Sequence, residues 1–304
     1  GPEATVAIVA LLTDAEQARR LAGIRLAGVR GLVEARSGLV RSANAADAVE
    51  RLAALKVLAD LASPAEVAPL LDGLARFPDG PTREAVGRAL AAACKADPEP
   101  QTHVPAILAH LPGAETPLIV SLLRVVDGIG GSAARKAVLN ASEAQDAAVR
   151  SAAYRLLGEW RGAADLPDLL RLAGVCPDAT GKLLCLRACV RFIGNDTLEP
   201  ERRMEIYRQI NPMIQRPDET KLLLAMLGNL PTTAALDGAA GHLADPAVRN
   251  EAATAVLAIA KVLVKGPEAG KAISALDKLM AVLPDTGPAR EAAILLKTAQ
   301  GKAK

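Results

Sequence analysis

The side chains that most often carry out catalysis are scattered along this chain. None of its three histidines, His103, His110 and His242, has a serine, cysteine or carboxylate at a spacing typical of a catalytic pair. We expect each imidazole to be satisfied by a neighbour or to face solvent. The sequence therefore contains no candidate catalytic residue and predicts a chain that is not an enzyme.

Three other features have residue types that could hold a metal, a phosphate or a cation. Cys185 and Cys189 lie four residues apart on one helix face, but no histidine or third cysteine stands at ligand spacing, so we expect core residues. The stretch GIGGSAAR at 128–135 lacks a preceding strand and predicts a turn between helices. Asp165 and Asp168 fall in predicted first helical turns, where carboxylates are favoured. No cofactor and no metal are predicted.

One pattern of charge recurs at a fixed place in successive segments. The stretch DAAVRSAAYRLLGEW (146–160) has similar copies along the chain, and we count each copy from the residue that corresponds to Arg150. In six consecutive copies a cation stands five residues after that first position. On a helical wheel this position points away from the apolar face. We call these six cations the basic column: Arg25, Lys56, Arg88, Arg124, Arg155 and Arg191.

The basic column has two interpretations. It predicts a ladder of cations that binds an anionic polymer or an acidic protein segment. Alternatively it is ordinary solvated helix surface, neutralised within each helix by residues such as Asp60, Asp127 and Glu159. Trp160, the only tryptophan, is expected to fill a junction between segments rather than to stack on a base.

The segments that contain the column predict paired helices. Apolar residues recur with a helical period, and Asp146 precedes its run as an N-cap. Similar segments begin at 20, 51, 83, 119, 150, 186, 220 and 249, mostly 31 to 36 residues apart. Most follow a plausible partner helix, such as THVPAILAHL from 102 and PERRMEIYRQINPMI from 200. This period predicts an all-α superhelix of about nine helix pairs, an α-solenoid that forms a single domain over 1–304.

Composition agrees with this architecture. Of the 304 residues 51% are hydrophobic but only 2% are aromatic, which favours closely packed helices rich in Ala and Leu. The net charge of +2 does not identify a partner. No apolar run is long enough to cross a bilayer, so we expect a soluble chain. The Gly-Pro start, with no Met and no signal peptide, indicates a tag remnant and predicts a piece of a longer protein.

The repeated segment resembles a known family. Asp, then Val-Arg, two small residues and Leu-Gly, as in Asp146, Val149, Arg150, Ala152–Ala153 and Leu157–Gly158, is similar to the HEAT repeat. DPAVRNEAATAVL at 245–257 follows the same pattern. The resemblance implies a right-handed α-α superhelix in which the second helices line the concave surface. It also implies that Asp146, Arg150, Asp245 and Arg249 are structural residues near turns, which bond between neighbouring repeats.

The resemblance also sets the functional hypotheses. The first is a non-catalytic scaffold that binds a protein, or a neighbouring domain of the same polypeptide, along its concave surface; it resembles HEAT segments of large bacterial proteins. The second is nucleic-acid binding, because the HEAT-like alkylpurine DNA glycosylases use a basic concave groove. A third resemblance, to bilin lyases with HEAT-like repeats, implies binding of a tetrapyrrole.

Overall fold

The computed structural model describes residues 1–78 and 80–301; within the predicted domain 1–304, residue 79 and residues 302–304 lie outside this part. All regular structure in the described residues is helical, which confirms the predicted all-α class. The chain divides into two compact units, Gly1–Leu156 and Leu157–Lys304. Each is described here by itself, and the single domain stays a prediction.

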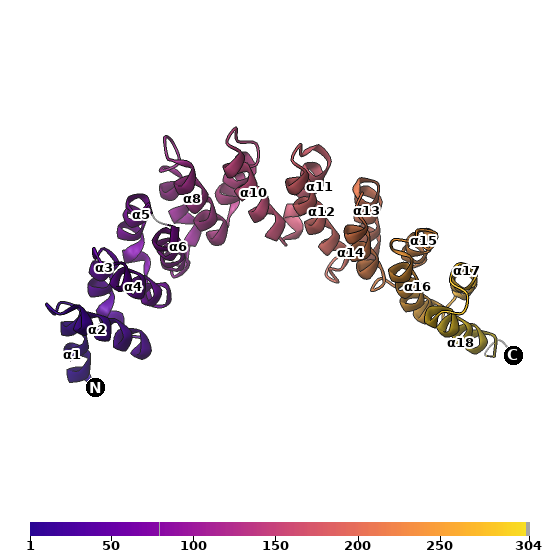
Figure 1. The fold of residues 1–304 in the computed structure, drawn as a ribbon, viewed down its shortest axis with the longest axis horizontal. Helices are drawn as coiled ribbons and strands as arrows, with labels where there is room; N and C mark the ends of the chain where they lie inside the picture. The colour runs from indigo at the N-terminus through magenta and orange to yellow at the C-terminus, as the bar shows by residue number, and fades with distance from the viewer. Residues whose placement is uncertain (79, 302–304) are drawn as a thin grey trace. The chain divides into compact units, whose positions relative to one another are not determined.

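The first unit contains helices that pack in sequential pairs (Figure 1). Because the connections are short, each contacting pair forms a helical hairpin. Contacts join α1 to α2, α3 to α4, α5 to α6 and α7 to α8. The helices of this unit are α1 (Pro2–Leu11), α2 (Gln17–Arg30), α3 (Arg36–Ala43), α4 (Ala48–Leu61), α5 (Val67–Arg76), α6 (Gly80–Lys95), α7 (Val104–Leu108), α8 (Thr116–Ile129), α9 (Ser132–Ala141) and, across the boundary, α10 (Ala147–Glu159).

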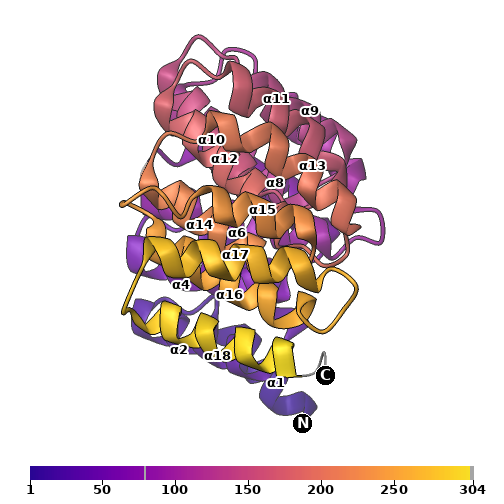
Figure 2. The same cartoon turned by 90° about the vertical axis from the view of Figure 1, so that its right-hand side faces the viewer.

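The second unit repeats this arrangement. Figure 2 shows helices α15 to α18 side by side, in agreement with contacts of α15 with α16 and α17, and of α18 with α16 and α17. The helices of this unit are α11 (Leu166–Val175), α12 (Ala179–Ile193), α13 (Pro200–Ile210), α14 (Pro217–Leu227), α15 (Thr233–Gly241), α16 (Arg249–Leu263), α17 (Ala269–Val282) and α18 (Gly287–Gly301).

The second helices of the pairs stack on one another in both units. In the first unit α2 contacts α4, α4 contacts α6 and α6 contacts α8; in the second unit α12 contacts α14, α14 contacts α16 and α16 contacts α18. We call the exposed side of these helices the second-helix face. Small residues bring the stacked backbones close together: a Cβ added to Gly28 of α2 would lie 2.9 Å from the side chain of Val57 in α4.

The core consists of aliphatic side chains, as the composition predicts. In the first unit it runs without interruption from Ile8 to Ala134 and includes Leu55, Leu90 and Leu122, each at most 1% exposed. Each helix pair buries its apolar side only against its neighbours. This is the packing expected of a helical repeat array.

Local chemistry sets the helix ends. Asp47 and Asp178 cap α4 and α12 by accepting from the amides of Glu50 (2.9 Å) and Gly181 (2.6 Å). The Gly-rich stretch at 128–135 forms the predicted turn, with Gly130 and Gly131 at φ +85° and +89° between α8 and α9.

Two predicted first helices are shorter than the periodicity indicates. The helix expected from residue 102 begins at Val104, after a 3-10 turn at Pro100–His103. Pro105 occupies its first turn, the only place where a missing amide is tolerated. The helix expected over 200–214 ends at Ile210, and the segment with Pro212 forms the 3-10 turn η5 (Asn211–Met213).

Candidate interaction surface

Arginines at the start of the second helices connect neighbouring repeats. Arg20 of α2 donates through Nη1 to the carbonyls of Asp14 and Ala15, both at 2.9 Å. Its Nε and Nη2 donate to the carboxylate of Glu50 in α4, at 3.0 and 2.8 Å. Glu50 is only 3% exposed, and the hydrogen bonds from Arg20 lower its pKa despite the opposing effect of burial. Arg20 thus fixes its own turn and the next repeat together.

The same link recurs about one repeat along the chain. Arg51 donates to the carbonyls of Ala45 (2.8 Å) and Ala46 (3.0 Å) and lies 3.4 Å from the hydroxyl of Thr82. Further links join Arg83 to Glu115 at 2.6 Å, Arg187 to Glu219 at 2.7 Å and Lys221 to Glu251 at 3.4 Å. These partners were not predicted from the sequence. The signal that could have found them is an acidic or hydroxyl residue near the start of the following second helix.

The four HEAT-motif residues all lie at turns. Asp146 accepts from the amides of Ala148 and Val149 and from the Thr116 hydroxyl of the preceding repeat, at 2.5 Å. These hydrogen bonds lower the pKa of Asp146, that from Thr116 contributing most.

The other three motif residues bond inside their own repeat. Arg150 donates to the carbonyls that close its own turn, at 2.5 and 2.7 Å, and Arg249 does the same at 3.2 and 3.3 Å. Asp245 accepts from the amide of Ala247. Within the described residues only Asp146 of the four therefore makes the bond between repeats that the resemblance implies.

Five members of the basic column are exposed: Arg25, Lys56, Arg88, Arg124 and Arg155. Arg88 pairs with Glu84 of its own helix at 2.8 Å, with both side chains 63% exposed. In the described part of the chain no carboxylate lies within ion-pair distance of the other four. In the described residues neither Asp60, Asp127 nor Glu159 lies within ion-pair distance of these four cations, and the ladder stays a prediction.

Two members of the column line one hollow on the second-helix face. This α6–α8 hollow has a volume of ≈ 360 Å³, and Arg88 and Arg124 stand beside Gly87, Ala91 and Val125. The two small residues of α6 leave the space, because a Cβ on Gly87 would meet only Val125 at 3.5 Å and Leu74 at 3.8 Å. The hollow combines apolar surface with the exposed guanidinium groups of Arg88 and Arg124, and Arg83, Ser121 and the carboxylate of Glu84 also line it.

Arg191 differs from the rest of the column. It lies in the last turn of α12, is half-buried and donates through Nη2 to the carbonyl of Gly158. Burial lowers its pKa. Its guanidinium thus has an acceptor within the second unit, and the exposed position predicted for it is wrong. Trp160 is half-buried and lines a hollow of ≈ 180 Å³ with Arg191 and Phe192.

The histidines form no cluster in the described residues, where no group of three or more potential metal ligands occurs. The Nε2 atom of His103 lies 3.0 Å from Oδ2 of Asp97. His242 is half-buried at the end of α15, and burial lowers its pKa. None of the helices in the described part combines the length and apolarity needed to cross a membrane.

The cysteines are buried and unpaired, as expected of core residues. Burial raises the pKa of Cys94 to about 11 and those of Cys185 and Cys189 to about 12. The thiolate is the reactive form, so we expect Ellman's reagent at pH 8 to label these three slowly in the folded chain and quickly in denaturant. Rapid labelling of all four thiols before unfolding would contradict this burial.

The chain is similar to known proteins in fold alone. No family model matches the chain, and no curated protein sequence is similar to it. The structure is similar to that of Kap121p, with a TM-score of 0.55 and 13% identity over 100% of this chain and 38% of that one. YIBA_ECOLI gives 0.45 and 13% over 90% and 91%, and the CpcE–CpcF complex of phycocyanin lyase from Nostoc sp. PCC7120 gives 0.39 and 16% over 92% and 94%. The predicted HEAT-like α-solenoid fold is confirmed.

Proposed function

We propose that the chain is a non-catalytic scaffold that binds an acidic segment of a partner protein, or of a neighbouring domain of the same polypeptide. The binding surface is the second-helix face of α2, α4, α6 and α8, extended by Arg155 of α10. The α6–α8 hollow supports this proposal, because Arg88 of α6 and Arg124 of α8 line it together with apolar surface.

Charge and shape at this hollow favour a protein ligand. Arg25, Lys56 and Arg124 have no carboxylate partner in the described residues, so their charges are available to a ligand. Guanidinium groups pair with carboxylates through two parallel hydrogen bonds. The hollow also offers apolar contact area, from Gly87, Ala91 and Val125, on which an aliphatic side chain can pack. A nucleic-acid phosphate backbone has no such side chain.

Charge reversal on the column tests the proposal. We expect the triple variant Arg25→Glu, Arg88→Glu, Arg124→Glu to weaken binding of a fluorescein-labelled peptide of alternating Glu and Leu by at least about tenfold, or about 1.4 kcal/mol. The measurement is fluorescence anisotropy. The matched control reverses three exposed cations of first helices, Arg41, Lys136 and Lys278, and should bind like the wild type.

Short duplex DNA separates the two classes of ligand. If DNA binds, loses affinity in the triple variant and weakens linearly in the logarithm of salt concentration, the column serves nucleic acid and the proposal fails. Equal peptide affinity in the triple and control variants would show that the column is ordinary helix surface.

A further inference from the structure

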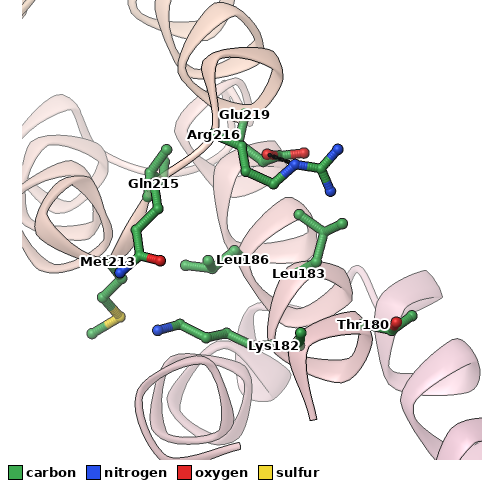
Figure 3. Close-up of a pocket in the computed structure, with 10 residues that line it drawn as sticks. Thr180, Lys182, Leu183, Leu186, Met213, Gln215, Arg216 and Glu219 are labelled. Atoms are coloured by element: carbon green, nitrogen blue, oxygen red, sulfur yellow. Dashed lines mark ion pairs between the residues drawn. The ribbon is translucent and has the colours of Figure 1, made fainter.

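A second hollow lies in the second unit, between the start of α12 and the connection from η5 to α14 (Figure 3). This α12–α14 hollow has a volume of ≈ 220 Å³. In Figure 3 the side chains of Leu183 and Leu186 lie between Lys182 on one side and Arg216 on the other, with Met213 at the edge. The hollow is therefore an apolar space between two cations.

The local sequence explains why this space exists. Asp178 caps α12. The first turn of α12 contains the small residues Ala179 and Thr180, which line the hollow. On the other side Pro212 and Pro217 divide the connection into the η5 turn and the start of α14. Leu183 remains half-buried and lines the hollow.

Glu219, a buried carboxylate that also lines the hollow, does not engage Arg216 fully. Glu219 is 2% exposed, and its Oε1 accepts from Nε and Nη2 of Arg187 at 3.1 and 2.7 Å. Its Oε2 has no hydrogen-bond donor, because Nε of Arg216 stays 3.6 Å away. The only other carboxylate near Arg216 in the described residues is that of Asp218, at 3.9 Å.

Two cations at the hollow keep hydrogen-bond donors that have no acceptor among the described residues. The guanidinium of Arg216, 59% exposed, makes ion-pair contacts but no hydrogen bond with the described residues. The ammonium of Lys182 has neither a carboxylate partner nor a hydrogen bond there. Among the residues that line the hollow, the cations Lys182 and Arg216 outnumber the one carboxylate, Glu219, which already pairs with Arg187.

We propose that the α12–α14 hollow is a docking site for a partner peptide in which an apolar side chain is flanked by acidic residues. The apolar side chain would lie on Leu183 and Leu186, and carboxylates on its two sides would meet Lys182 and Arg216. The volume favours one anchoring side chain, because pockets for small molecules usually measure about 300–1,000 Å³. The site lies in the other unit from the α6–α8 hollow and does not rest on the function proposed above.

A random heptapeptide display library tests this site without a known partner. We expect selected peptides to place Leu, Met or Phe beside Asp or Glu. The double variant Lys182→Glu, Arg216→Glu should bind the synthetic consensus peptide about tenfold or more weakly. The matched control reverses Arg208 on α13 and Lys278 on α17, both exposed, and should bind normally.

Methyl resonances of methionine locate the peptide directly. In wild-type chain labelled with ¹³C at the methionine methyl groups, the consensus peptide should shift the resonance of Met213, assigned with Met213→Leu, and leave that of Met280 in α17 unchanged. This measurement stands even if the double variant is unfolded. Three results would overturn the site: an unmoved Met213 resonance, a consensus without acidic residues, or a folded double variant that binds the peptide as tightly as the wild type. Loss of binding in the variant Arg88→Glu, Arg124→Glu would instead assign the peptide to the α6–α8 hollow.

Discussion

Replacing Leu122 with Ala is expected to lower the free energy of unfolding by about 2–5 kcal/mol. Leu122 of α8 is fully buried and belongs to the continuous core of the first unit. The substitution removes apolar contacts and leaves a cavity that the packed helices can close only in part. Chemical denaturation followed by circular dichroism measures the change. Val29→Ala serves as the control, because Val29 is 86% exposed and should change stability by less than about 0.5 kcal/mol.

In the Leu122→Ala variant, the positions along the chain at which stability is lost test the repeat architecture. Helix α8 contacts α6, α7 and α9, so amide hydrogen exchange should accelerate most in these helices. In an array stabilised by nearest neighbours the effect should fade with distance, leaving α16 to α18 of the second unit almost unchanged. Equal acceleration over all described helices would instead indicate one cooperative domain, as predicted for 1–304.

The paired-helix fold was predictable because its determinants are local. Apolar periodicity sets the buried side of each helix, and the caps and turn glycines set its ends; Asp146 and Gly130 lie where these rules place them. The two shortened helices depart from the periodicity at Pro105 and Pro212. There a missing amide hydrogen overrides the apolar pattern.

The candidate site was only partly predictable. The column position in α2, α4, α6 and α8 is exposed, as the helical wheel indicates, since a wheel depends on one helix alone. The burial of the Arg191 side chain depends on its hydrogen bond to the carbonyl of Gly158, which lies in another helix. The helical period contains no information on that contact. The two hollows were likewise not predicted. One depends on small side chains in neighbouring helices, and the other on a turn that interrupts the connection between two helices.

Replacing Glu50 with Gln is expected to destabilise the chain more at pH 7 than at pH 3. The pKa of Glu50 lies below its ordinary value of 4.5, mainly because Arg20 donates to both carboxylate oxygens. A carboxyl with a lowered pKa in the folded state stabilises the fold above its unfolded-state pKa. That contribution disappears as the pH falls through the folded-state pKa. At pH 7 the glutamine removes the charged partner of Arg20, whereas below the unfolded-state pKa the wild-type carboxylate itself contributes less to stability.

Thermal melting curves of the two proteins at several pH values measure this difference. The gap in melting temperature between wild type and Glu50→Gln should be constant above about pH 6 and should narrow steadily below the ordinary pKa. Glu84→Gln is the matched control, because its carboxylate also pairs with an arginine, Arg88, but both side chains are 63% exposed. Such a surface pair contributes little at any pH, so the control should follow the wild type. A gap for Glu50→Gln that is the same at pH 3 and pH 7 would mean that the shape of the side chain, and not its charge, joins α2 to α4.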